Sequence, residues 1–277
     1  MALPSVRQSP NAQSFVQTPY PFYDRARALG PLVHWSDYDM CATTTYESTN
    51  TILRDRRFGR EPVTPVTFPD RLAPFYAIES HSMLELEPPR HTRLRSLVLR
   101  AFTSRRIKNL APEITALCHQ LIDSFPATSF DLLKTYATPL PVIIIARLLG
   151  VPESMADDLL RWSNAMVSMY QARRTREIED TAAQAAQDFS DFMRGYINER
   201  RSKPADDLIT HLIAAEEDGE KLSTDELITT CILLLNAGHE ATVHTLGNGV
   251  KTLLQNTNPD QNLMDWLSED MAPKTVE

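Results

Sequence analysis

Apolar residues recur at helical spacing along most of the chain from Pro88 onward. Between residues 94 and 121 they return every three or four positions, at Leu94, Leu97, Val98, Ala101, Phe102, Ile107, Leu110, Ile114, Leu117 and Leu121. This period is typical of amphipathic helices. Pro139 and Pro141 suit the first turn of a further helix, and Gly150 predicts its end at Leu149. The pattern therefore predicts a mainly helical protein.

One predicted helix is much longer than the others. Ser223, Thr224, Asp225 and Glu226 form a capping box, with Ser223 as N-cap and Glu226 reaching back to it. Nothing interrupts the helix before about Gln255, so it would be roughly 50 Å long at 1.5 Å per residue. Such a helix can run through the middle of a domain.

The first 87 residues show shorter and more varied segments. We expect two helices, two strands joined by a turn at Ser36-Asp37, and a long loop rich in proline and aromatic residues. In chain order these are a helix over 22–29, strands over 32–35 and 40–46, a helix over 47–55 and a loop over 59–80. Asp218-Gly219 predicts another turn, between two later helices.

Composition excludes several classes of protein. The formal net charge of -8 argues against a nucleic-acid-binding protein that relies on positive charge. The first seven residues lack the pattern of a secretory signal. No apolar run approaches the roughly 20 residues that a membrane-spanning helix needs. We therefore expect a cytoplasmic protein.

The three cysteines, Cys41, Cys118 and Cys231, are far apart in the chain. They show no Cys-x-x-Cys spacing, which argues against a disulfide framework and against a zinc site. We expect most or all of them to be buried, reduced thiols.

The centre of the long helix combines an apolar run with an abrupt polar cluster. His239, Glu240 and His244 could suggest a zinc-protease helix, but that motif places its two histidines four residues apart. A spacing of five rotates His244 by about 140° from His239, so one ion cannot take both ligands from a straight helix. An acid and a glycine in mid-helix still require an explanation.

A second polar constellation lies near Pro88-Pro89. His91 and Arg95 are four residues apart and share one side of a helix, so they could clamp a carboxylate. The alternative is an ordinary solvated basic face. No acid interrupts the run of basic residues here, which are Arg90, Arg93, Arg95, Arg100, Arg105, Arg106 and Lys108. Such a face could attract an acidic partner.

These features together resemble the cytochrome P450 family, in its soluble bacterial form. The similar segments follow in family order: residues 19–31 resemble the first helix and its exit, 53–58 the end of the B helix, 86–107 the C helix, and 237–242 the oxygen-binding stretch of the I helix. The resemblance implies a mainly α fold, consisting of helices A to I with a small N-terminal β-hairpin and a long central I helix. Residues 1–277 would form a single domain, truncated at its C-terminus.

The resemblance also implies haem as cofactor. His91 and Arg95 would bind a haem propionate, and Ala237, Gly238 and Ala241 would lie against the cofactor. Gly238 would let the I helix widen locally, which makes a groove over the iron.

A proton relay is implied beside the haem. Glu240 would be its acid. The usual alcohol follows this acid directly, but here that position is Ala241 and Thr242 comes one residue later. One residue is about 100° of helix rotation, so Thr242 cannot take the same place without local distortion. Either Thr242 or water would substitute, or protons would be delivered differently.

Substrate and partner follow from the same resemblance. The substrate would be a small hydrophobic molecule in contact with the loop around 61–87 and with Met166, Met169 and Tyr170. A ferredoxin or flavodoxin-type protein would bring electrons to the basic face over 90–108. The reaction would insert one oxygen atom of O2 into the substrate.

The chain departs from the family in one large respect. The Glu-x-x-Arg helix and the Phe-x-x-Gly-x-x-x-Cys haem loop both follow the I helix, and neither is present in these 277 residues. Phe192 to Gly195 opens like that loop, but Glu199 stands where cysteine is required. We therefore expect no axial cysteine and an inactive chain. The alternative is a non-enzymatic helical remnant of the family that binds a ligand or a partner.

Overall fold

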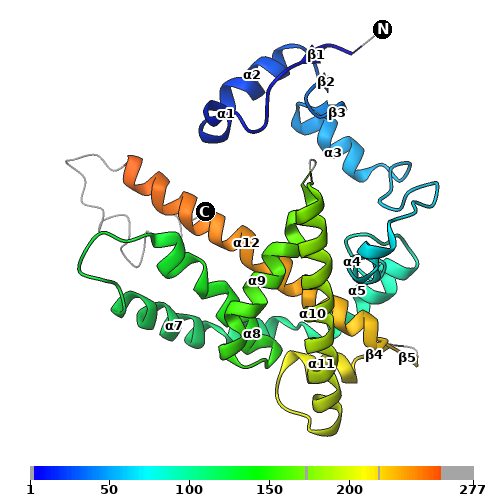
Figure 1. The fold of residues 1–277 in the computed structure, drawn as a ribbon, viewed down its shortest axis with the longest axis vertical. Coiled ribbons are helices and arrows are strands. Elements are labelled where there is room, and N and C mark those ends of the chain that lie inside the picture. Colours follow the sequence, from blue (N-terminus) through cyan, green and yellow to red (C-terminus); the bar gives the residue numbers. More distant parts are fainter. Residues whose placement is uncertain (1–2, 172–173, 218, 257–277) are drawn as a thin grey trace. The chain divides into compact units, whose positions relative to one another are not determined.

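Helices make up most of the structure, a computed structural model that describes residues 3–171, 174–217 and 219–256 (Figure 1). The chain divides into two compact units, one up to Thr64 and one from Pro65 onward. The mainly α fold with a small N-terminal sheet is confirmed. The single domain over residues 1–277 stays a prediction.

The first unit packs short helices against a three-stranded sheet. Strand β2 pairs in parallel with β1 and antiparallel with β3, which confirms the predicted hairpin. Its elements are β1 (Ser5–Val6), α1 (Gln13–Gln17), α2 (Tyr20–Ala28), β2 (Leu32–Trp35), β3 (Met40–Thr43) and α3 (Tyr46–Arg54). Strand β3 ends earlier than predicted because Thr45 caps α3, where its Oγ1 accepts a hydrogen bond from Ser48 N at 3.2 Å.

The expected loop over 59–80 is wrong in its last third. Residues Asp70–Leu72 form the 3₁₀ turn η1, and Ala73–Glu79 form the helix α4. Leu72, Phe75 and Ile78 follow one another at a spacing of three and are all buried. These contacts with the core outweigh the local signals of proline and aromatic residues that favoured a loop.

The second unit is a helical assembly around two long helices, α10 and α12. Its elements, besides η1 and α4, are α5 (Arg90–Ala101), α6 (Ser104–Asn109), α7 (Ala111–Asp123), the π-helical turn η2 (Leu133–Ala137), α8 (Pro139–Leu149), η3 (Glu153–Met155), α9 (Ala156–Val167), η4 (Ser168–Tyr170), α10 (Arg176–Ser202), α11 (Leu208–Ala214), β4 (Glu216–Glu217), β5 (Glu220–Lys221) and α12 (Thr224–Asn256). Helix α8 ends as predicted, with Gly150 in the left-handed conformation at φ 85°. The predicted turn at Asp218-Gly219 lies between β4 and β5, although Asp218 is outside the described residues.

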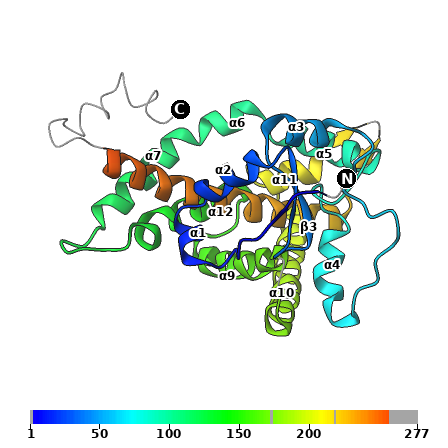
Figure 2. The same ribbon diagram turned by 90° about the horizontal axis from the view of Figure 1, so that it is seen from above.

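Helix α12 begins and ends close to the predicted positions. Glu226 N donates to Ser223 Oγ at 3.2 Å, and Ser223 N donates to Glu226 Oε2 at 2.8 Å, so the capping box is confirmed. The helix has 33 residues and crosses the unit (Figure 2). None of the helices within the described ranges is both long and apolar enough to cross a bilayer.

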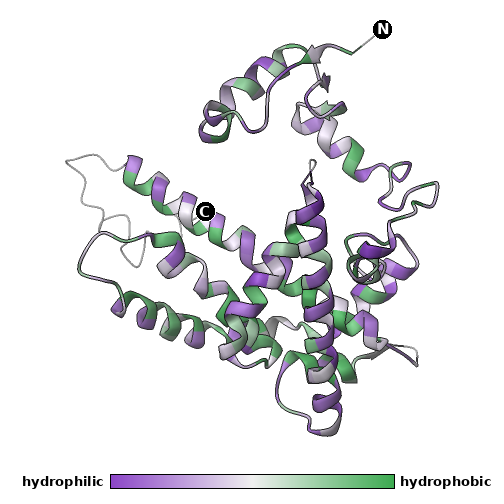
Figure 3. Cartoon of the chain, in the orientation of Figure 1, coloured by the Kyte–Doolittle hydropathy of each residue, from purple (hydrophilic) through white to green (hydrophobic). Residues whose placement is uncertain are grey.

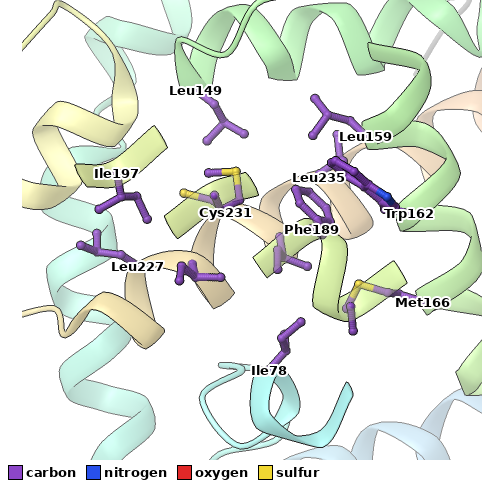
Figure 4. Close-up of a cluster of buried hydrophobic side chains, with 14 of the residues drawn as sticks. Ile78, Leu149, Leu159, Trp162, Met166, Phe189, Ile197, Leu227, Cys231 and Leu235 are labelled. Atoms are coloured by element: carbon purple, nitrogen blue, oxygen red, sulfur yellow. The ribbon is translucent and has the colours of Figure 1, made fainter. Parts of the chain in front are cut away.

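The core lies where α8, α9, α10 and the first half of α12 meet. Phe189 from α10, Leu159 and Trp162 from α9, Leu149 from α8 and Leu235 from α12 all point into it (Figure 4). Green apolar segments concentrate on the facing sides of these helices, whereas α10 is largely purple on its outer side (Figure 3). Burial of this cluster fixes the position of the first half of α12.

Candidate functional site

His91 and Arg95 occupy one flank of α5. Leu94 and Leu97 bury the side of the helix that faces the core, at 1% and 0% exposure. His91 is half-buried and Arg95 is exposed, and the spacing places them about 40° apart around the axis. Both side chains carry N–H donors and are therefore presented in one direction, as a carboxylate clamp requires.

The other flank of α5 is held by protein contacts. Arg93 forms ion pairs with Glu226 of α12 and, at 3.3 Å, with Glu220 of β5. Arg90 Nη2 donates to Ser80 O at 3.0 Å. The basic residues of this helix therefore lie on two flanks rather than on one continuous face.

The side of α12 at Ala237 and Ala241 is exposed among the described residues. Two methyl side chains one turn apart leave a low, apolar strip against which a flat ring can lie. Phe102, the C-cap residue directly after α5, lines the same apolar groove as Ala237. An apolar strip on α12 together with N–H donors on α5 is the set of groups that a haem with its propionates requires, so these residues fit that cofactor.

The local widening of α12 at Gly238 stays a prediction. The helix continues through Gly238 without interruption. A Cβ atom at this position would stand 2.8 Å from Ile145 Cδ1 of α8. The physical reason for glycine here is the close approach of α8.

An apolar groove of about 420 Å³ runs beside this contact. It is formed by α7, α8 and α12 and by the end of α5, and its lining includes Phe102, Ile114, Pro141, Ile144, Leu233 and Thr242. Thr242 Oγ1 donates to Gly238 O at 2.8 Å, so its hydroxyl is bonded to its own helix.

Glu240 and Thr242 are not brought together. Two residues correspond to about 200° of rotation, and Thr242 lines the groove towards α8. The side chain of Glu240 is 47% exposed, and its Oε1 lies 4.0 Å from His244 Nε2. Ala241 presents no hydroxyl, so no alcohol side chain directly follows the acid.

His239 has a different environment from His244, as the spacing of five residues predicts. His239 is 2% exposed and contacts α9, whereas the side chain of His244 is 67% exposed. His239 Nδ1 lies 3.3 Å from Ser163 Oγ, and its Nε2 lies 3.2 Å from Asn164 Oδ1. His239 Nδ1 also lies 3.2 Å from Leu235 O of its own helix, so both ring nitrogens have partners.

The residues expected to contact the substrate have unequal environments. Met166 and Met169 are each 1% exposed and pack in the core, where Figure 4 shows Met166. Tyr170 is 49% exposed, and its hydroxyl donates to Glu79 Oε1 at 3.1 Å. Their role in substrate binding stays a prediction.

Sequence reasoning missed Asn236. Its Oδ1 is buried and has no hydrogen-bond partner among the residues that the structure describes. An amide that follows Leu233, Leu234 and Leu235 in a helix interior is the signal that could have identified it.

The cysteines are only partly as expected. Cys231 is fully buried, and burial raises the pKa of its thiol to about 12. Cys118 is partly buried and hydrogen-bonded to Tyr136, whose pKa is raised to about 12, mainly by burial. Cys41 is exposed, so the expectation of a buried thiol is wrong there. Cys41 lies on β3, an edge strand of the sheet, and not in the core.

Comparison with known proteins points to one family. The family model described as "Cytochrome P450" matches residues 31–265. The chain is 36% identical over 258 residues to the polyketide biosynthesis cytochrome P450 PksS of Bacillus subtilis, covering 89% of this chain and 62% of that protein. It is 35% identical over 280 residues to the cytochrome P450 monooxygenase PikC of Streptomyces venezuelae, covering 94% and 63%. The chain thus spans less than two thirds of the length of these relatives.

A solved structure agrees with the sequence relatives. The crystal structure of P450BioI in complex with an acyl carrier protein ligated to hexadec-9Z-enoic acid superimposes with a TM-score of 0.86 at 30% identity. The match covers 96% of this chain and 68% of that chain.

Proposed function

This chain belongs to the cytochrome P450 family, and we propose that it supplies the haem-propionate clamp and the proton-relay helix of a haem-dependent monooxygenase. Haem supplies the oxidation chemistry when it is bound. The reaction would insert one oxygen atom of O2 into a small apolar molecule.

The observation that carries this proposal is the pairing of two features of the second unit. His91 and Arg95 present N–H donors on one flank of α5, and Ala237 and Ala241 present a low apolar strip on α12. The clamp would hold the propionates by charge-assisted hydrogen bonds, while the strip would allow close approach of the ring. The alternative of a merely solvated basic face leaves the exposed alanine strip without an explanation.

Glu240 would hold and release a proton at its carboxylate oxygens. It is half-exposed and close to His244, so it can exchange protons with solvent. Ala241 supplies no hydroxyl, and Thr242 donates its own to Gly238 O. We infer that an ordered water, rather than Thr242, completes the relay.

The environments of the three cysteines do not suit an iron ligand. A thiolate is required, and burial strongly disfavours that form at Cys231. Cys118 is hydrogen-bonded to Tyr136, and Cys41 belongs to the first unit. We propose that these 277 residues alone bind haem without a thiolate ligand and are inactive as a monooxygenase.

The substrate and the electron donor belong to the same proposal. The fatty-acyl group in the P450BioI complex supports an apolar substrate. A ferredoxin or flavodoxin-type donor with an acidic surface would dock at exposed basic residues within 90–108 that lie outside the clamp, such as Lys108.

The test is a haem titration of the chain, followed by absorbance. Replacement of His91 and Arg95 together by alanine should weaken haem binding at least about 10-fold, because each charge-assisted bond contributes about 1.5–3 kcal/mol. Thr92→Ala, an exposed change in the same helix, is the control and should leave the affinity unchanged. Equal affinity of the double variant and the control would contradict the clamp.

A second function is favoured by the apolar groove between α7, α8 and α12. A non-enzymatic member of the family could bind a ligand or a partner there without haem. The titration separates the two functions, because such a protein would show no saturable haem binding.

A further inference from the structure

Glu226 makes two contacts at once at the start of α12. Its Oε2 accepts a hydrogen bond from Ser223 N at 2.8 Å, which closes the capping box, and its Oε1 accepts one from Arg93 Nη2 of α5. Either glutamate or glutamine completes a capping box, so the cap does not explain the charge. Glu226 is 7% exposed, and a carboxylate this buried requires a cationic partner. The contact with Arg93 therefore explains why residue 226 is an acid.

Arg93 lies on the flank of α5 opposite to the clamp formed by His91 and Arg95. It is two positions from each of them, which corresponds to about 200° of rotation around the helix. The buried face with Leu94 and Leu97 lies between the two flanks. Apolar contacts are non-directional, whereas a bond from a guanidinium to a carboxylate has a fixed direction. The rotation of α5 about its axis, and with it the direction of the clamp, is therefore set on the side of Arg93.

The acid that holds Arg93 belongs to the same helix as the alanine strip. Ala237 follows Glu226 by 11 positions, or about 16 Å along α12. The cap fixes the carboxylate of Glu226, which makes it a rigid reference for α5. Glu220 of β5 also lies 3.3 Å from Arg93 Nε, but its side chain is 61% exposed, and exposed pairs contribute little. Glu226 therefore links the two helices that form the proposed haem site.

We propose that Glu226 is a positioning residue for the haem. Through Arg93, it holds α5 in the rotation that directs His91 and Arg95 at the propionates. This inference rests on the proposed function, since Glu226 acts through the proposed clamp. Loss of its charge should weaken haem binding while the clamp is present, and should have no further effect once the clamp has been removed.

The first test is a haem titration of Glu226→Gln in two backgrounds. The substitution keeps an acceptor for Ser223 N and removes the charge that Arg93 meets. With the clamp intact, haem affinity should fall about 3- to 10-fold, as for a change that acts through a neighbouring contact. In the background without His91 and Arg95, the further loss should be less than about 2-fold, because no clamp remains to be directed. Equal losses in the two backgrounds would overturn the proposal, since a general loss of structure does not depend on the clamp.

The matched control is Glu220→Gln, which removes the exposed acid beside the same arginine. It should change haem affinity by less than about 2-fold with the clamp intact. A loss as large as that of Glu226→Gln would overturn the assignment of this role to Glu226.

A second variant and a measurement without haem show whether folding is affected. The thermal midpoint of Glu226→Gln should fall by about 2–8 °C, because one partner of a buried pair loses its charge. Arg93→Lys is milder, since it keeps the charge beside Glu226 but lacks the planar fork of the guanidinium. It should weaken haem binding by a smaller factor, and again only while the clamp is present. Unchanged haem affinity in both variants would overturn the proposal.

A failure of the proposed function gives a different result from a failure of this inference. If the unmodified chain binds no haem, or if the variant without His91 and Arg95 binds it equally well, the clamp is contradicted and the role of Glu226 with it. If that variant binds haem weakly but Glu226→Gln does not, the clamp stands and the positioning role alone is overturned.

Discussion

His239 Nε2 on α12 lies 3.2 Å from Asn164 Oδ1 on α9, and this hydrogen bond ties the two helices together one residue before Glu240. The imidazole is buried, and its Nδ1 also meets Ser163 Oγ at 3.3 Å. Since side chains at 239 and 240 are about 100° apart, fixing His239 against α9 also fixes the direction of Glu240.

A double-mutant cycle tests this coupling. His239→Leu and Asn164→Leu should each lower the free energy of unfolding by about 1–3 kcal/mol, because the first removes the partner of the buried Ser163 hydroxyl and the second removes a partner of the buried His239 ring. The double variant should lose less than the sum, since both partners are then removed. Urea denaturation of the four proteins gives the coupling energy. His244→Leu, at an exposed position, is the control and should change stability by no more than about 0.5 kcal/mol. Strict additivity would show that the contact is not made.

The contact between Gly238 and Ile145 gives a second prediction. Gly249, on the same helix, has no atom within 4 Å of an added Cβ, so Gly249→Ala should raise stability by about 0.5–1 kcal/mol. Gly238→Ala should raise the free energy of unfolding by at least about 1 kcal/mol less than Gly249→Ala does, because the added methyl group displaces Ile145 Cδ1. Ile145→Val removes that methyl group and should restore part of the difference in the double variant. Equal gains at the two glycines would contradict the close approach of α8.

The ion pairs of Arg71 predict a dependence of stability on pH. Hydrogen bonding to Arg71 holds the pKa of Glu179 below its ordinary value of 4.5. Asp180 Oδ1 lies 2.7 Å from Arg71 Nη1, and its pKa is also lowered, first by Arg176. A carboxylate with a lowered pKa stabilises the folded state above its ordinary pKa, and this stabilisation is lost as the pH falls.

Arg71→Met should therefore destabilise the chain at pH 7, and the difference from the unmodified chain should shrink as the pH falls below about 4.5. Thermal midpoints measured between pH 3 and pH 8 give this profile. Arg194→Met, which removes the exposed pair with Asp225, is the control and should show a smaller effect at every pH. A difference that grows on acidification would have the wrong sign for this network.

The parts of the fold that the sequence predicted are those encoded by neighbouring residues. The capping box at Ser223 and Glu226, the glycine end of α8 at Gly150 and the hairpin of β2 and β3 each depend on a few adjacent positions. Helix α4 was missed because its stability comes from Leu72, Phe75 and Ile78 packing on distant helices. Spacing within the chain does not contain that information.

The candidate site divides in the same way. The shared flank of His91 and Arg95 follows from helical spacing alone. The role of Gly238 could not be predicted, because it depends on Ile145, which is 93 positions away in the chain. The same holds for His239, whose partners Ser163 and Asn164 lie on α9.

The most direct test of the account is the carbon monoxide difference spectrum of the reduced chain after addition of haem. Haem should bind in a manner that depends on His91 and Arg95, and the thiolate-type Soret band should be absent. We expect no thiolate-type band because burial raises the pKa of the Cys231 thiol and because Cys118 is hydrogen-bonded to Tyr136. A thiolate-type band from these 277 residues, lost on replacement of Cys41, Cys118 or Cys231 by serine, would contradict the account.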